Sequence, residues 1–300
     1  MDKYDLLKDK LGNDVRRDVE LAQFTTFRIG GPAKFFYEAK NPQQLLFAYD
    51  TAIKEGLVFF ILGGGSNILF ADEGFDGLVI KDSCRDIVVD GNTITTQSGV
   101  WLDNLVNTAA ENSLAGLEFA AGIPGNVGGA VYGNAGAFGW SMADVLESAV
   151  VYNPRDGLRI VENSHFGFAY RHSRLKEKHE LVLSAKLKLT SGEKGEIVDK
   201  INAHRQLRRA KHPVKEGSAG SVFKNIKQPE LRPAGKILED SGVRGMRVGG
   251  AEIFEKHCNI IINRGRATAA DVRKLAAMMQ QKAFDKFGIE LEYEITIFKP

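Results

Sequence analysis

The sequence has few of the features that mark secreted, thiolate-bound metal or membrane-spanning proteins. It contains 2 cysteines among 300 residues, Cys84 and Cys258, too few for a disulfide framework or a thiolate metal site. No apolar run approaches the ~18 residues that a membrane span requires, and the first residues are rich in charge. We therefore expect a cytoplasmic protein with two buried, inert thiols, which is neither secreted nor embedded in a membrane.

Familiar ligand-binding motifs are also missing. The 6 histidines show neither His-Glu-x-x-His nor paired metal spacing, so we expect no bound metal. No Gly-x-Gly-x-x-Gly follows a strand pattern and no Gly-x-x-x-x-Gly-Lys-Ser/Thr occurs, which argues against an ordinary Rossmann or P-loop protein. The net charge is +2 and basic residues do not interleave with aromatic ones, so nucleic acid is not the expected partner.

Glycine, by contrast, is concentrated in two stretches. The first glycine loop, residues 63–67 (Gly-Gly-Gly-Ser-Asn), follows an apolar run typical of a strand at 57–62. The second glycine segment spans residues 122–139 and begins Gly-Ile-Pro-Gly-Asn-Val-Gly-Gly. Glycine can hold positive φ and lets backbone N–H groups approach an anion, so both stretches can cradle a diphosphate. Our first hypothesis is therefore a dinucleotide or similar phosphorylated cofactor, although glycine-rich loops also serve simply as tight turns.

The apolar fraction of 43% and the charged fraction of 26% are those of a globular protein, and 300 residues favour two or three domains. The pattern indicates a helix capped by Asn41-Pro42 and stopped by Gly56. Antiparallel strands are expected in the middle of the chain, with a domain boundary near residue 206. Further helices are expected after residue 100 and at 197–210, 233–240 and 268–287, followed by a closing strand at 291–297.

Three groups of polar residues have both an ordinary and a functional interpretation. Ser221 lies beside a glycine, which is usual for a turn, and no Gly-x-Ser-x-Gly elbow marks it as a nucleophile. Glu290, Glu292 and Glu294 alternate along the expected final strand, as on a solvated sheet face. Basic residues between 205 and 215 suit a helix end, and they could also clamp a diphosphate.

Taken together, several segments resemble one family, the UDP-N-acetylenolpyruvoylglucosamine reductases, flavoenzymes of bacterial cell-wall precursor synthesis. The resemblance covers roughly residues 23–297 and keeps the order of the family's motifs. The stretch between Arg171 and Ser221 is shorter than in relatives with an extra tyrosine-bearing substrate loop, so the chain resembles the shorter form. The matching segments are residues 26–33, 63–67, 116–119, 122–139, 170–171, 219–225 and 291–295.

The resemblance implies an α+β protein of three domains. Two domains of the vanillyl-alcohol-oxidase/PCMH type would hold FAD without a covalent bond, and a C-terminal α+β domain would bind the substrate. The expected boundaries are 1–83 for the first FAD-binding subdomain, 84–206 with the final strand 290–300 for the second, and 207–289 for the substrate-binding domain.

The resemblance also implies the reaction. In the family, NADPH reduces FAD, hydride then passes from the flavin to the enolpyruvyl group of a UDP-sugar, and a proton is added at the neighbouring carbon. Ser221 matches the proton donor, and Arg171 and Glu294 match the pair that stabilises the intermediate at the substrate carboxyl. The substrate-contacting positions are Tyr170, Lys211, Lys224 and Asn225.

The cofactor-binding residues that the resemblance implies all lie in the two glycine stretches. They are Gly63, Gly64, Gly65, Ser66, Asn67, Gly122, Ile123, Pro124, Gly125, Asn126, Gly128, Gly129, Ala130, Gly133, Asn134 and Ala135.

The sequence alone leaves two alternatives open. One is another FAD enzyme of the same fold, such as a sugar or hydroxyacid oxidase, which would lack the combination of Ser221, Arg171 and Glu294. The other is a nucleotide-sugar-binding module without catalytic activity. The leading interpretation is a monomeric enzyme whose partners are NADPH and a UDP-sugar enolpyruvyl ether.

Overall fold

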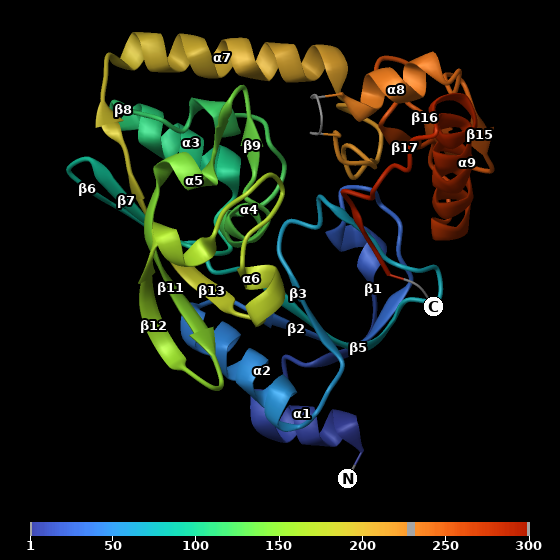
Figure 1. Ribbon diagram of the computed structural model, residues 1–300. Helices are drawn as coiled ribbons and strands as arrows, with labels where there is room; N and C mark the ends of the chain where they lie inside the picture. Colours follow the sequence, from blue (N-terminus) through green and yellow to red (C-terminus); the bar gives the residue numbers. More distant parts are fainter. Residues whose placement is uncertain (1, 227–231, 299–300) are drawn as a thin grey trace. The chain divides into compact units, whose positions relative to one another are not determined.

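The computed structural model describes residues 2–226 and 232–298 (Figure 1). They form two compact units. Unit 1 holds the described residues within Met1–Arg17, Phe35–Gly64 and Gly77–Leu207, and unit 2 holds those within Asp18–Lys34, Gly65–Asp76 and Arg208–Pro300. No helix in these parts of the chain is both long and apolar enough to cross a membrane.

An antiparallel sheet in unit 1 confirms the strands expected in the middle of the chain. Its strand order is β12-β11-β13-β7-β6, and each neighbouring pair is antiparallel. Gly91 adopts positive φ in the turn that joins β6 to β7, and Gly157 does so as the first residue of β12, directly after the turn from β11. The strands are β6 (Ile87–Asp90), β7 (Thr93–Gln97), β11 (Leu146–Asn153), β12 (Gly157–Glu162) and β13 (Leu181–Lys188).

A bulge in β13 divides the side chains of this strand between two cores. In the sequence, Leu181, Leu183, Ala185 and Leu187 alternate with mostly polar residues. In the structure, the register with β11 skips Leu183, so the alternation shifts by one residue. Leu181 and Leu183 pack in a core with α2 (Pro42–Lys54), whereas Ala185 and Leu187 join Val182 in a second core. The bulge therefore sends the residues of one alternating series to two different cores.

The second sheet carries the first glycine loop. Its strand order is β1-β2-β5-β3, and β3 (Phe59–Leu62) runs parallel to β5 (Phe75–Asp82), with Leu62 opposite Lys81. The preceding helix α2 begins as predicted, because Pro42 occupies its first turn and the Asn41 side chain accepts from the Gln44 N–H at 2.9 Å. The other two strands are β1 (Arg16–Glu20) and β2 (Pro32–Ala39).

The remaining elements in the first two thirds of the chain are mostly short. α3 confirms the helix predicted after residue 100, and Cys84 is buried as expected. The elements are α1 (Lys3–Leu11), η1 (Leu21–Phe24), β4 (Ile68–Leu69), α3 (Leu102–Glu111), β8 (Leu114–Ala115), η2 (Glu118–Ala120), α4 (Val127–Gly133), β9 (Gly136–Ala137), β10 (Trp140–Ser141), α5 (Met142–Val145), η3 (Asn163–Phe166), α6 (Leu175–Lys178), β14 (Thr190–Ser191) and α7 (Lys194–Lys211).

Unit 2 is built around a helix and a small sheet. Thr268 and Asp271 form the predicted capping box of α9 (Ala269–Phe287). This helix shares a core with Phe223, Leu238 and Ile261. The other elements are α8 (Ala234–Asp240), β15 (Arg247–Val248), β16 (Ala251–Ile253), β17 (Ile261–Asn263) and β18 (Thr296–Ile297), and β15, β16 and β17 form an antiparallel sheet.

The predicted closing strand at 291–297 is shorter in the structure. Only β18 is regular, and it pairs in parallel with β4. Upstream, Tyr293 forms a single bridge with Phe223. The segment meets two different partners in succession, so it does not form one continuous ladder.

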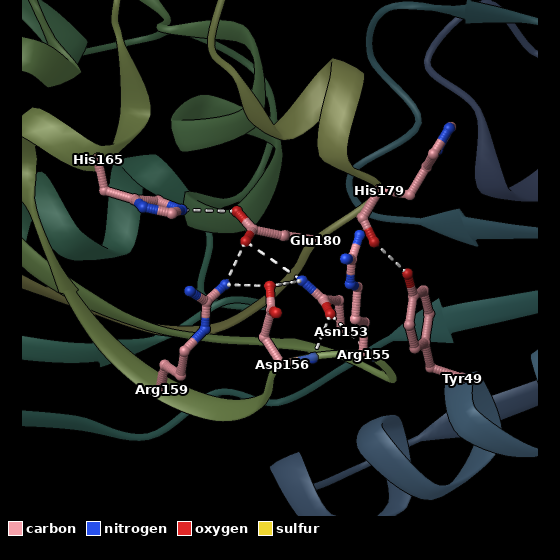
Figure 2. A network of polar contacts seen from close by, with 8 residues as sticks. All are labelled: Tyr49, Asn153, Arg155, Asp156, Arg159, His165, His179 and Glu180. Atoms are coloured by element: carbon pink, nitrogen blue, oxygen red, sulfur yellow. Dashed lines mark hydrogen bonds and ion pairs between the residues drawn. The ribbon is translucent and has the colours of Figure 1, made fainter.

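A buried polar network closes the β11–β12 hairpin onto the start of β13 (Figure 2). The Glu180 carboxylate accepts from Arg159 at 2.6 Å and from Asn153 at 3.3 Å, and it lies 2.7 Å from Nε2 of His165. The Glu180 side chain is fully buried. A buried carboxylate is costly unless it is paired, and here three side chains from other segments of unit 1 compensate for the burial.

We expect Glu180→Ala to lower the free energy of unfolding by about 3 kcal/mol, because it removes the fully buried carboxylate that pairs with Arg159, His165 and Asn153 and leaves the half-buried Arg159 guanidinium without its shortest ion pair. Urea denaturation measures this loss. The matched control is Glu177→Ala, which removes an exposed partner of His172 and should change stability by less than about 0.5 kcal/mol. Equal effects of the two substitutions would contradict the structural role of the network.

Candidate functional site

The two glycine stretches pack against each other in unit 1. A Cβ on Gly63 would lie 2.4 Å from Oδ1 of Asn126, and a Cβ on Gly64 would lie 2.7 Å from the Cα of Gly125. The ring of Trp101 would lie 2.9 Å from the same Gly64 Cβ. These distances are shorter than any real Cβ contact, so glycine is required here for close approach of the two backbones.

Two asparagines shape the second glycine segment. Asn126 caps α4, because its side chain accepts from the Gly129 N–H at 3.2 Å. Asn134 ends the helix in the left-handed conformation, with φ of 45°. Its side chain accepts from the Ala143 N–H at 3.1 Å and donates to the Ala169 carbonyl at 2.9 Å. Asn134 therefore ties this segment to the turn that carries Tyr170 and Arg171.

Tyr170 and Arg171 are the central residues of a tight turn. Ala169 and His172 exchange both backbone hydrogen bonds across it, each at 3.1 Å. Arg171 has φ of 55°, a conformation that costs about 1 kcal/mol or more for a residue other than glycine. Its guanidinium lies 5.1 Å from the centre of the Tyr170 ring and donates to the Gly136 carbonyl at 3.4 Å. The strained turn therefore restricts the position of the Arg171 guanidinium.

In unit 2, backbone hydrogen bonds place the Ser221 segment beside the Glu294 segment. The Glu294 N–H donates to the Val222 carbonyl at 2.8 Å, and the Lys224 N–H donates to the Glu292 carbonyl at 2.8 Å. Ser221 itself forms a bridge with Ile260. These bonds bring the predicted proton donor and the predicted carboxylate onto adjacent stretches of extended chain.

Asn67, at the end of the first glycine loop, joins the same cluster. Its side-chain amide donates to the Glu294 carbonyl at 3.0 Å, and its own carbonyl accepts from the Thr296 N–H at 2.9 Å. Lys224 and Asn225, two of the predicted substrate-contacting residues, also have partners within unit 2. Nζ of Lys224 lies 3.1 Å from a carboxylate oxygen of Glu292, and Asn225 accepts from the Ala234 N–H at 3.0 Å.

Asn259 is a residue of this cluster that the sequence analysis missed. It is 1% exposed, and its side chain accepts from the Phe223 N–H at 3.0 Å and donates to the Phe223 carbonyl at 2.8 Å. The Asn259 amide thus makes with Phe223 both backbone hydrogen bonds that a neighbouring strand would make. The one indication of Asn259 in the sequence is its position next to the apolar run 260–262.

Thr26 is a second missed residue. Its hydroxyl donates to the Ser218 carbonyl at 2.7 Å, and its N–H donates to the Gly65 carbonyl at 3.0 Å. Thr26 therefore connects the first glycine loop to the segment that leads into Ser221. The motif at 26–33 supported the family resemblance, but it did not indicate a role for this side chain.

The predicted site residues thus fall into two groups. Unit 1 holds Gly63, Gly64, residues 122–139, Tyr170 and Arg171. Unit 2 holds Gly65 to Asn67, Lys211, Ser221, Lys224, Asn225 and Glu294. Lys211 is the last residue of α7 and is exposed.

The fold and these residues define a flavin-binding protein. A model of an FAD binding domain matches residues 33–161, and a model of the C-terminal domain of UDP-N-acetylenolpyruvoylglucosamine reductase matches residues 212–298.

Curated relatives and a solved structure then give the family. The reductase of Caldicellulosiruptor saccharolyticus is 40% identical over 98% of this chain and 94% of that relative, and that of Clostridium perfringens is 39% identical over 99% and 97%. The crystal structure of the Thermus caldophilus reductase superposes with a TM-score of 0.82 at 33% identity, over 95% of this chain and all of that one. The chain belongs to the UDP-N-acetylenolpyruvoylglucosamine reductase family.

The glycine stretches fit FAD. Within residues 2–226 and 232–298, the N–H groups of Gly64 and Gly65 meet no hydrogen-bond acceptor, so two consecutive donors can bind the oxygens of a diphosphate. On α4, Gly129 and Gly133 lie four residues apart and share one face. A Cβ on Gly133 would meet nothing within 4 Å, whereas one on Gly129 would lie 3.0 Å from Oδ1 of Asn126, so the face is open for a bound group at Gly133.

A pair of histidines lies beside the basic end of α7. The rings of His212 and His257 are 5.8 Å apart. Burial lowers the pKa of His212 to about 4, and the nearby charges of Arg208 and Lys211 act in the same direction. His212 is therefore neutral in the folded protein at pH values at which the unfolded chain is protonated.

The folded protein binds fewer protons at His212 than the unfolded chain between pH 6.5 and about 4. The contribution of His212 to the free energy of unfolding is fully present above pH 6.5. It decreases as the pH falls through that window, by about 1 to 2 kcal/mol after allowance for the partial exposure of the side chain. Urea denaturation at pH 7.5 and pH 5 measures the loss, which should be smaller in His212→Gln. Identical slopes in the wild type and His212→Gln would refute the assignment.

Proposed function

We propose that this protein is the NADPH-dependent reductase that converts UDP-N-acetylglucosamine enolpyruvate to UDP-N-acetylmuramate in peptidoglycan precursor synthesis. Two matched relatives and a matched crystal structure carry this reductase name over nearly the whole chain. The observation that supports it best is the cluster of Ser221, Asn67 and the Glu294 segment, which joins the predicted proton donor to the end of the first glycine loop. We further propose that the enzyme acts as a cytoplasmic monomer.

Bound FAD supplies a two-electron carrier between NADPH and the substrate. The protein must then add a proton to the carbon beside the substrate carboxylate. A serine hydroxyl is a weak acid, but the carbanion-like intermediate is a strong base, so a hydroxyl within hydrogen-bond reach can deliver the proton. We assign this role to Ser221, whose backbone is fixed on both sides by the Ile260 bridge and the Val222 hydrogen bonds.

Negative charge moves toward the substrate carboxylate when the hydride is added. A guanidinium held at that carboxylate stabilises the transition state more than the ground state. We assign this role to Arg171, because its left-handed backbone and the Tyr170 ring restrict its position before any ligand arrives. Glu294 completes the catalytic set, and Tyr170, Lys211, Lys224 and Asn225 contact the substrate.

The function can be tested with the purified holoprotein under anaerobic conditions. NADPH should bleach the yellow flavin, and subsequent addition of UDP-N-acetylglucosamine enolpyruvate should restore its absorbance. Bleaching without recovery, together with oxygen consumption on a simple alcohol, would favour an oxidase of the same fold. A colourless protein that takes up no FAD would favour a binding module.

We expect Ser221→Ala to reduce the flavin with NADPH at the wild-type rate and to lose product formation by about 10²-fold or more, because only the proton transfer is removed. Stopped-flow absorbance follows the first step and product analysis follows the second. Ser218→Ala is the control, since Ser218 lies three residues away and bonds only to the Gly220 N–H through its hydroxyl among the described contacts. Equal losses in both half-reactions of Ser221→Ala would remove Ser221 from the proton-transfer step.

A further inference from the structure

Lys81 is a buried cation at the base of the first glycine loop. It is the residue opposite Leu62 in the β3–β5 pair and is only 8% exposed. Its Nζ donates to the Gly63 carbonyl at 2.7 Å and lies 3.4 Å from the Asp82 carbonyl. Nζ is also 5.8 Å from the centre of the Trp101 ring, the same ring that packs against Gly64.

The contacts of Lys81 compensate for its burial only in part. A buried ammonium group is costly unless a counter-charge and hydrogen bonds replace water. Burial lowers the pKa of Lys81, and the neighbouring Asp82 carboxylate opposes this shift without cancelling it. Asp82 is itself engaged, because one of its carboxylate oxygens accepts from the Cys84 N–H at 3.1 Å. Its burial raises its own pKa, which weakens it as a counter-charge.

The position of Lys81 suits an anion bound at the glycine loop. Its hydrogen bond fixes the Gly63 carbonyl, and the next two N–H groups, those of Gly64 and Gly65, meet no acceptor within the described parts of the chain. A diphosphate bound by those donors would provide the missing negative charge. Binding of an anionic ligand therefore explains the burial of Lys81 better than stabilisation of the fold does.

We propose that Lys81 is a positioning residue for the cofactor, which orders the first glycine loop through the Gly63 carbonyl and supplies positive charge to the diphosphate of FAD. The inference rests on FAD binding and adds a residue outside both glycine stretches. Because it concerns affinity for the cofactor, it can fail while the proposed reaction stands.

The test compares Lys81→Met and Lys81→Arg with the wild type. Each apoprotein is titrated with FAD while flavin fluorescence is followed, and its melting temperature is measured without FAD. Lys81→Met should bind FAD at least about tenfold more weakly. Its apoprotein should melt no lower than the wild type, because methionine fills a similar volume without a buried charge. Lys81→Arg should recover most of the affinity.

Arg85→Met is the matched control. It removes a charge of the same sign four residues away, from an exposed side chain near enough to affect the Lys81 pKa. It should bind FAD as the wild type does, which separates the buried charge from a change in net charge.

The outcomes divide cleanly. Wild-type affinity in Lys81→Met, or an equal loss in Arg85→Met, overturns the proposal for Lys81 while leaving FAD binding intact. If the Lys81→Met apoprotein melts lower, the arginine variant decides: recovered FAD affinity supports the proposal, and no recovery overturns it. A wild-type apoprotein that takes up no FAD would instead overturn the proposed function.

Discussion

Close approach of two backbones at Gly63 and Gly64 is the constraint on which the candidate cofactor site depends. The Cβ positions of both residues are already occupied by Asn126, Gly125 or Trp101. Packing, rather than flexibility, therefore explains the absence of side chains there. Since this contact holds one side of the first glycine loop, its neighbouring N–H groups can face a ligand without the loop having to order itself first.

Side-chain hydrogen bonds to the backbone hold the chain around Ser221 in place. The segments at 221–225 and 292–295 meet each other in a single bridge at Phe223 and Tyr293, and side chains supply further bonds to their backbones. Asn259 satisfies both backbone groups of Phe223, and Asn67 and Thr26 tie in the first glycine loop. Fixed backbone of this kind positions functional side chains more accurately than a mobile loop would.

Two buried charges differ in how far the surrounding protein compensates for their burial. Glu180 is matched by Arg159, His165 and Asn153, so its burial closes a network that belongs to the fold (Figure 2). Lys81 meets mainly carbonyl oxygens, and its pKa is lowered by burial. A charge that the protein does not fully compensate indicates a ligand more strongly than a paired charge does.

Residue type and spacing along the chain are enough to predict the local elements and the order of the motifs. Short-range geometry explains the helix cap at Asn41, the capping box at Thr268 and the antiparallel strands in the middle of the chain. The motifs at 63–67 and 122–139 indicated the family. The bulge at Leu183, the division of the closing segment between two partners, and the contacts of Asn259 and Lys81 become visible only in the folded structure. These features depend on contacts between residues distant in the chain, and residue type and spacing do not specify such contacts.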